Sequence, residues 1–271
     1  AAIGTSSVAD APNSVAIGFN AHAGNGTLSF SHAYAIGGHA NAIGQQTYAF
    51  GTGANATGFV TMALGDYART EGSSSTALGT GAYALANQSL ALGAFSNASA
   101  EGATAIGNFS NASAVYAQAF GMQANASGVS SIAIGNSSRA LRNSSVAIGT
   151  NATSNNADSY AMGHNATTSA SGSYAMGDGA YTTVTATNSF AIGMRAQVSE
   201  QNSYAMGREA KALALSAYAI GTQANASGTS SYALGSLASA SGTGSYALGS
   251  WANASGNYSI AQGYLSNATG E

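Results

Sequence analysis

The feature that most constrains this chain is a short motif that returns every fourteen residues. Nineteen copies of the motif occur along 271 residues, and each consists of alanine, a large apolar residue and glycine, except the last, which has Gln262 in the middle. Sixteen of the eighteen intervals between the motif glycines are fourteen residues; the others are nineteen, from Gly18 to Gly37, and sixteen, from Gly177 to Gly193. A fixed short period is typical of a stacked repeat architecture, because each unit packs on the next copy of itself.

Small and large side chains alternate within each repeat. The residue two before each motif glycine is alanine, from Ala2 to Ala261, whereas the residues one and three before it are mostly Ile, Leu, Met, Val, Tyr or Phe. Successive side chains of a strand leave opposite faces, so this alternation predicts a strand and not a helix. After the glycine, Ala or Ser at the third residue and mostly Ala at the fifth, with variable polar residues between them, indicate a second strand.

Each repeat is thus expected to form one coil of two strands of about five residues, joined by turns of about two. Gly, Asn and Ser between the strands supply the dihedral angles of such turns. The sequence predicts an all-β parallel solenoid of about nineteen coils, with alanine in a thin core and the large residues facing out. A triangular β-helix needs longer coils, and a calcium-binding roll needs Asp-rich nonapeptides that are missing here.

Composition argues against several classes of function. Charged residues are 6% of the chain and the net charge is −3, so we expect no nucleic-acid partner. No apolar run is long enough to cross a bilayer, so we expect no direct membrane insertion of this segment. Serines lack a paired His and Asp arrangement, so we expect no catalytic residues and no cofactor. We also expect no metal site at the four histidines, which lack ligand spacing: His22, His32, His39 and His164.

The outward-facing large residues predict that the chain does not exist alone. Together they would expose an apolar strip far larger than a soluble monomer tolerates. Cyclic association of identical chains buries such a strip, and the period alone permits two chains or three. The residues expected at the oligomer interface are Val15, Ile17, Tyr34, Ile36, Val146, Ile148, Tyr160, Met162, Tyr174, Met176, Phe190, Ile192, Tyr204, Met206, Tyr218, Ile220, Tyr232, Leu234, Tyr246 and Leu248.

The repeat also resembles that of a known family. Ser-Val-Ala-Ile-Gly at Ser14 to Gly18 and at Ser145 to Gly149, varied elsewhere as Ser-Tyr-Ala-Met-Gly and Ser-Tyr-Ala-Leu-Gly, is similar to the head repeat of the YadA-like trimeric autotransporter adhesins of Gram-negative bacteria. The resemblance covers nearly the whole chain. It implies a left-handed parallel β-roll, a homotrimer, that binds extracellular-matrix proteins such as collagen, fibronectin or laminin and is not an enzyme.

The same resemblance implies an extracellular location at the cell surface, held to the outer membrane through parts that are not in this segment. We expect one head domain over residues 1–271, since no neck, heptad stalk or membrane anchor is found in the sequence. A second hypothesis is a structural subunit of an extracellular filament or surface layer. An open β-coil presents unpaired backbone groups, which favour end-to-end stacking.

Asparagines form one group of candidate sites. Asn-x-Ser/Thr occurs fifteen times, and seven copies lie four residues after a motif glycine, where the side chain should face outward. They are candidate glycosylation sites. Alternatively they hydrogen-bond as a ladder, and glycans on consecutive coils would crowd at a spacing of about 5 Å. The seven are Asn55, Asn97, Asn111, Asn125, Asn225, Asn253 and Asn267.

Two other features are open to a functional or a structural interpretation. The five-residue insertion within residues 24–32 is either a recognition loop or a tolerated surface bulge. A charged cluster beside the two-residue insertion is either a binding patch or a solvated stretch of the outer sheet. That cluster comprises Arg195, Glu200, Arg208, Glu209 and Lys211.

Overall fold

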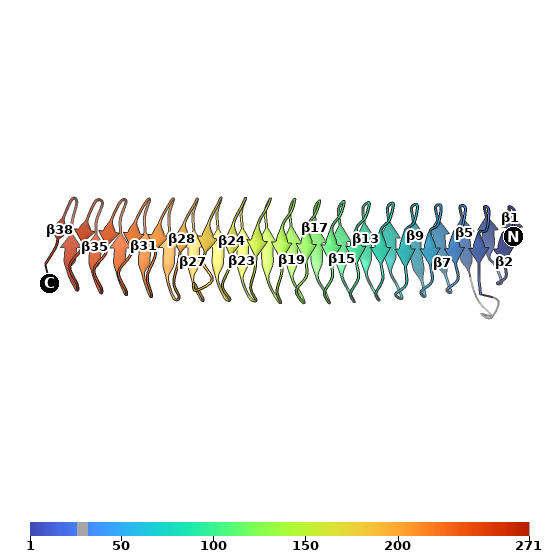
Figure 1. Cartoon of the computed structure of the whole chain (residues 1–271), viewed down its shortest axis with the longest axis horizontal. Helices are drawn as coiled ribbons and strands as arrows, with labels where there is room; N and C mark the ends of the chain where they lie inside the picture. Colours follow the sequence, from blue (N-terminus) through green and yellow to red (C-terminus); the bar gives the residue numbers. More distant parts are fainter. Residues whose placement is uncertain (26–31, 271) are drawn as a thin grey trace. The chain divides into compact units, whose positions relative to one another are not determined.

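The computed structural model describes residues 1–25 and 32–270, and every regular element in them is a β-strand. Contacts divide the chain into two compact units, Ala1–Ser137 and Ser138–Glu271. In each unit the odd-numbered strands form one parallel sheet and the even-numbered strands form the other (Figure 1). The expected all-β parallel solenoid is confirmed. Its left-handedness, its trimeric state and the single domain over residues 1–271 stay predictions.

The first unit contains β1 to β19. Its odd-numbered strands are β1 (Ala2–Ile3), β3 (Val15–Ile17), β5 (Ala33–Ile36), β7 (Thr47–Phe50), β9 (Thr61–Leu64), β11 (Thr76–Leu78), β13 (Leu90–Leu92), β15 (Thr104–Ile106), β17 (Gln118–Phe120) and β19 (Ile132–Ile134). Its even-numbered strands are β2 (Val8–Ala9), β4 (His22–Ala23), β6 (Asn41–Ala42), β8 (Asn55–Ala56), β10 (Arg69–Thr70), β12 (Tyr83–Ala84), β14 (Asn97–Ala98), β16 (Asn111–Ala112) and β18 (Asn125–Ala126).

The second unit contains β20 to β38. Its even-numbered strands are β20 (Arg139–Ala140), β22 (Thr153–Ser154), β24 (Thr167–Thr168), β26 (Tyr181–Thr182), β28 (Gln197–Val198), β30 (Lys211–Ala212), β32 (Asn225–Ala226), β34 (Ser239–Ala240), β36 (Asn253–Ala254) and β38 (Asn267–Ala268). Its odd-numbered strands are β21 (Val146–Ile148), β23 (Tyr160–Met162), β25 (Tyr174–Met176), β27 (Phe190–Ile192), β29 (Tyr204–Met206), β31 (Tyr218–Ile220), β33 (Tyr232–Leu234), β35 (Tyr246–Leu248) and β37 (Ile260–Gln262).

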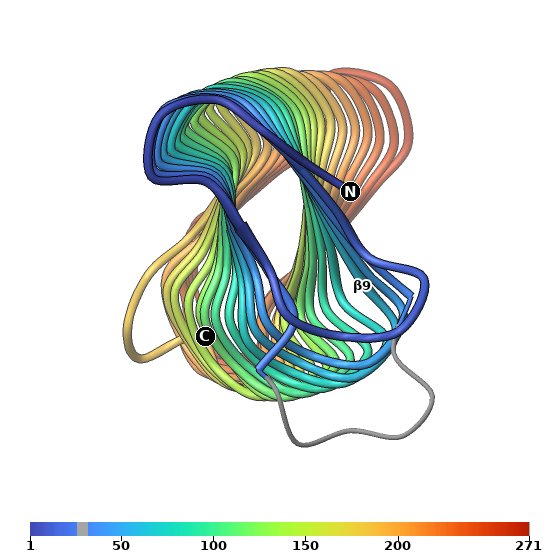
Figure 2. The ribbon, with the colours of Figure 1, turned by 90° about the vertical axis from the view of Figure 1, so that its right-hand side faces the viewer.

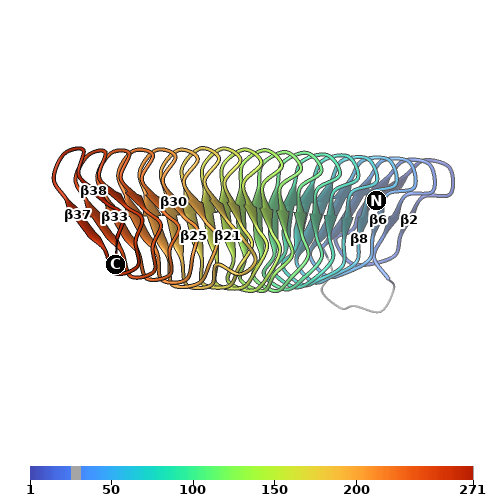
Figure 3. The same cartoon turned by 60° about the vertical axis from the view of Figure 1, so that its left-hand side comes forward.

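Register follows the sequence period. Ala219 of β31 pairs with Ala205 before it and Ala233 after it, each fourteen residues away. Equivalent side chains therefore stack from coil to coil, and Figure 3 shows the turns of the second unit following one another along its edge. The motif alanines are fully buried in the core, apart from those of the outermost coils. The predicted sorting of methyl groups inward and large groups outward is confirmed.

The strands are shorter than expected. Odd-numbered strands span two to four residues and even-numbered strands two, rather than about five. The difference lies in the turns, and at the first turn two residues adopt a positive φ that leaves the sheet. Gly221 has a φ of 137° and Gln223, two residues later, has a φ of 56°. Reversing the chain in this way takes the four residues from Gly221 to Ala224, which shortens both strands.

The motif glycine is required for two reasons. Its φ lies between 113° and 146° in the described coils, a region that residues with a Cβ rarely enter. It also lies against the next coil: a Cβ on Gly221 would be 2.4 Å from the carbonyl oxygen of Gly235. The serine that begins many motifs stabilises the other turn, since the buried hydroxyl of Ser173 donates to the carbonyl oxygen of Ala170 at 2.6 Å.

Bulky residues also occupy left-handed turn positions, which the sequence analysis assigned to Gly, Asn and Ser. Phe95 has a φ of 56° and Trp251 a φ of 61°. Where such a residue is aromatic, the coil before it often carries glycine at the same place. The ring of Phe95 lies over Gly81, whose missing Cβ would be 2.8 Å from the ring. The contact between ring and glycine offsets part of the dihedral cost, which is about 1–2 kcal/mol.

Candidate functional site

An aromatic stack lies on the outer face of the odd-numbered strands of the second unit. Consecutive ring centroids are 4.5 to 5.0 Å apart and the ring planes lie within 12° of parallel. In-register parallel pairing stacks the rings, because each coil places its ring directly over the one before. The seven stacked residues are Tyr160, Tyr174, Phe190, Tyr204, Tyr218, Tyr232 and Tyr246.

A second outward column runs beside the stack, one residue before each motif glycine. It carries Met, Ile and Leu, of which Met206 is 47% exposed. All the residues expected at the oligomer interface face outward, and they are half-buried or exposed. In the first unit Tyr34 and Tyr48 stack in the same way at 5.4 Å. The apolar face is therefore continuous along the stack of the second unit, whereas Thr76, Thr104 and Gln118 interrupt the same column in the first unit. Contact of this face with a second chain stays a prediction.

Stacking changes the acidity of the central ring. Burial raises the pKa of the Tyr218 hydroxyl above 10.0, and the neighbouring Tyr204 and Tyr232 raise it further. A tyrosinate at position 218 would be desolvated between its neighbours. The stack thus favours the neutral form of Tyr218.

Amide ladders lie on the opposite sheet. Asn97 donates to Asn111 at 2.9 Å and Asn111 donates to Asn125 at 3.0 Å, from Nδ2 to Oδ1 in both cases. Asn41 with Asn55, and Asn253 with Asn267, form the same bond. The ladder interpretation of these asparagines is confirmed for the pairs named. Glycosylation of the seven candidates stays a prediction.

The charged cluster is divided between the two edges of the coil. Arg195 and Glu209 occupy the left-handed position of the first turn on consecutive coils, Arg208 lies beside Glu209, and Lys211 projects from β30. Glu200 lies at the second turn, where Thr185 donates to its Oε1 at 3.4 Å. The sequence cluster is therefore two separate groups, because residues close in sequence lie on opposite ends of a flattened coil.

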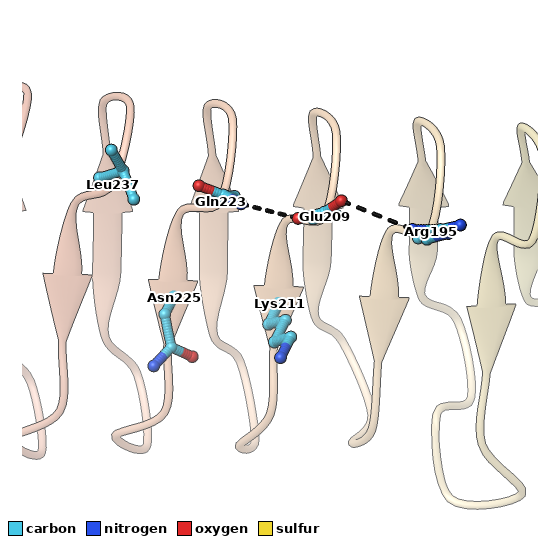
Figure 4. Close-up of a pocket in the computed structure, with 6 residues that line it drawn as sticks. All are labelled: Arg195, Glu209, Lys211, Gln223, Asn225 and Leu237. Carbon is cyan, nitrogen blue, oxygen red and sulfur yellow. Dashed lines mark hydrogen bonds and ion pairs between the residues drawn. The ribbon is translucent and has the colours of Figure 1, made fainter.

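The group at the first turn lines a shallow open groove (Figure 4). The lining residues come from consecutive coils of the second unit: Arg195, Glu209, Lys211, Gln223, Asn225 and Leu237. Gln223 and Leu237 were not singled out from the sequence, and Asn225 was singled out only as a glycosylation candidate. The signal that would have found them is periodic, since each lies fourteen residues after a member of the cluster or after another lining residue.

Glu209 is the hub of the polar contacts in this groove. Gln223 Nε2 donates to Glu209 Oε2 at 2.7 Å, and Arg195 Nη1 lies 3.9 Å from Glu209 Oε1. The hydrogen bond from Gln223 lowers the pKa of the Glu209 carboxyl, burial opposes this, and the cations Arg208, Arg195 and Lys211 lower the pKa further. Glu209 is thus held as a carboxylate at neutral pH.

The two-residue insertion falls at the second turn. Residues 183–189 form a loop that protrudes from the second unit, drawn in yellow in Figure 2. Thr183 and Thr185 fix the loop by donating to the carbonyl oxygen of Ser199 at 2.5 and 2.6 Å, and Val184 is 75% exposed at its tip. The other insertion, within residues 24–32, lies largely outside the described residues.

Histidines pair with carboxylates that sequence spacing did not reveal. His164 Nδ1 lies 2.7 Å from Asp178 Oδ1, and His22 Nε2 lies 3.3 Å from Asp10 Oδ2. These partners are one coil apart, so they are distant in sequence. Among the described residues no group of three His, Cys, Asp or Glu side chains is placed to hold a metal ion. In the same part of the chain, no helix has the length and hydropathy needed to cross a membrane.

Comparison with known proteins gives one family. The family model described as the YadA head domain repeat, in two copies, matches most of the chain, at residues 1–21, 42–68, 56–82, 71–96, 84–110, 98–124, 126–152, 154–180, 170–196, 212–238, 240–266 and 254–271. No curated protein gives a significant match. One similar solved structure is the collagen-binding domain of the Yersinia adhesin YadA, at 28% identity over 52% of this chain and 69% of that chain, with a TM-score of 0.39.

Proposed function

Because the chain belongs to the YadA head repeat family, we propose that it is the non-enzymatic head of an adhesin at the cell surface. The observation that carries this proposal is the match of the family's repeat along most of the chain. The head would attach cells to extracellular-matrix proteins such as collagen, fibronectin or laminin. Its polar even-numbered strands offer the same shallow surface on coil after coil, which allows many weak contacts to add up to avidity.

Association of copies is the second part of the proposal. The outer face of the odd-numbered strands carries stacked Tyr and exposed Met, Ile and Leu over the whole second unit. Burial of apolar surface contributes about 25 cal/mol per Å². We infer that this face meets the same face of two further copies in a homotrimer, which leaves the polar even-numbered strands to contact partners.

The mass of the purified chain in solution tests the association. We expect a trimer by sedimentation equilibrium, and partial dissociation in the variant Ile148→Ser/Tyr218→Ser, which weakens the apolar face at two coils. Arg139→Ser, on an even-numbered strand, is the matched control and should leave the mass unchanged. A stable, soluble monomer of the unmodified chain would contradict the interface, and a dimer would contradict the three-fold arrangement.

Solid-phase binding tests the adhesive role. The folded chain should bind immobilised collagen, fibronectin or laminin in a saturable manner, and heat-denatured chain should not. Indifference to all three proteins would refute the matrix-protein assignment. The measurement should be made on material whose mass has been determined, since loss of association would reduce avidity without touching the binding surface.

A further inference from the structure

The groove at the first turn of the second unit has an unused positive charge. It runs between a row of turn residues and a row of strand residues on the even-numbered side, away from the apolar face (Figure 4). Glu209 is already engaged by Gln223 through one oxygen, and Arg195 is a loose neighbour at 3.9 Å whose side chain is 69% exposed. The Lys211 ammonium has no hydrogen bond or ion pair with another described residue. Two cations against one occupied carboxylate leave the groove net positive.

The groove also contains an unsatisfied acceptor. Oδ1 of Asn225 is buried and has no hydrogen-bond partner among the described residues. In the amide ladders this oxygen accepts from the asparagine one coil earlier, but the residue that pairs with Asn225 there is Lys211. A buried acceptor without a donor costs about 1–3 kcal/mol. The oxygen is closed to solvent, so a ligand hydroxyl becomes its donor only where binding in the groove uncovers it.

Apolar surface continues the same row. Leu237 lines the groove, and Trp251 occupies the equivalent turn position one coil further on, where its amide donates to the carbonyl oxygen of Ser236. Trp251 is 52% exposed. An exposed indole presents a flat, electron-rich face that attracts the polarised C–H groups of a sugar ring. Anion-binding, hydroxyl-binding and apolar groups therefore follow one another along one edge of the unit.

We propose that this groove binds an acidic polysaccharide, that is, a glycan whose sugars carry carboxylate or sulfate groups. Arg195 and Lys211 would bind the anionic groups, Asn225 and Gln223 the hydroxyls, and Trp251 a sugar face. The groove is open and its positions repeat at about 4.8 Å, so it suits an extended chain of repeating units better than a compact ligand. An acidic peptide matches the charge but offers few hydroxyls for Asn225. This site does not depend on matrix-protein binding.

Binding of two defined glycans to the full chain tests the proposal. Heparin supplies sulfates, hyaluronan supplies carboxylates, and neutral dextran is the negative control. Each cation contributes a charge-assisted contact, so R195Q/K211Q should weaken binding to heparin or hyaluronan about tenfold or more. R139Q/R142Q removes the same charge from the same unit outside the groove and should change affinity less than about twofold. Circular dichroism establishes that both double variants are folded.

The competing outcomes are distinct. Absence of binding to both glycans, or equal loss in the two double variants, would overturn the site. Polyglutamate is the acidic-peptide probe: if it binds as tightly as the glycans and W251A has no effect, the groove takes acidic peptides instead. Weaker glycan binding in W251A, with polyglutamate binding poorly, supports a sugar ligand. Collagen, fibronectin and laminin binding by R195Q/K211Q is measured in parallel, so failure of the adhesin proposal is detected separately.

Discussion

Replacing one motif glycine tests the physical basis of the repeat most directly. In Gly221→Ala the new Cβ would lie 2.4 Å from the carbonyl oxygen of Gly235, against 3.4 Å or more in ordinary contact. The oxygen cannot retreat without moving its own coil, because the amide of Gly235 donates to the carbonyl oxygen of Ile220 at 2.8 Å. The substitution therefore combines a forbidden dihedral angle with a collision between coils.

The expected loss of stability in Gly221→Ala follows from the dihedral cost and from the collision between coils. A residue with a Cβ at such a φ costs about 1–3 kcal/mol. Weakening one inter-coil hydrogen bond costs about 1 kcal/mol more. The reduced entropy of the unfolded chain offsets about 0.4–1 kcal/mol. We expect Gly221→Ala to lower the free energy of unfolding by about 2–3 kcal/mol, measured by urea denaturation followed by circular dichroism.

Gly179→Ala is the matched control. Gly179 has a φ of 63°, and a Cβ added to it would have Cγ of Arg195 as its nearest neighbour, at 3.5 Å, so the substitution adds no collision. The left-handed conformation costs about 1–2 kcal/mol and the unfolded chain offsets about 0.4–1 kcal/mol of that, which leaves a loss of at most about 1.6 kcal/mol. If the two variants lost the same stability, the close approach of the glycines would not be what fixes the motif.

Three further outcomes are expected. Ala147→Leu overfills the fully buried core and should cost about 1–3 kcal/mol in the same urea assay, whereas an unchanged midpoint would refute the thin core. Because the pKa of Tyr218 is raised in the folded chain, its contribution to stability is complete below pH 10.0 and is lost as the pH rises through the higher folded pKa. Ultraviolet titration should show tyrosinate forming at a higher pH in the folded chain than in the unfolded chain. Asn111 should carry no glycan when the chain is made in a glycosylating host, because its Nδ2 is engaged by Asn125 at 3.0 Å, and a modified Asn111 peptide in the mass spectrum would contradict this.

The fold was predictable because the alternation of small and large side chains can be seen within a few residues of sequence. The alternation at Ser145 to Gly149 alone assigns Ala147 to the core and Ile148 to the surface, and the burial of the two residues agrees. The groove was not predictable from local sequence. Lys211 and Asn225 are neighbours only because the register is fourteen residues, and the unsatisfied oxygen of Asn225 depends on which residue the adjacent coil supplies.

The turn residues show that the packing of the coils can override the preference of a residue for a backbone conformation. Leu237 and Trp251 take left-handed φ values of 57° and 61°, which no propensity argument assigns to them. Their dihedral angles are imposed by the register of the coils, since the amides of both donate to carbonyl oxygens of the preceding coil. An inner coil of either unit is hydrogen-bonded to the coils on both sides of it. The position of a residue in the coil therefore fixes its backbone dihedral angles, whatever its side chain.

The positions of the insertions follow from the same constraint. Most of the described coils have two left-handed turn residues, such as Gln223 and Ser230, seven positions apart. Yet in the sequence the first turn always has four residues, from the motif glycine to the following Ala or Ser, whereas both insertions fall at the second. The first turn contains the column of touching glycines, and one extra residue would separate Gly221 from Gly235 and the coils beyond them. The second turn accepts Arg142, Glu200 or glycine at one place, because the φ of the residue there is not positive. Recognition loops can therefore be added to this fold at the second turn without disturbing the stack.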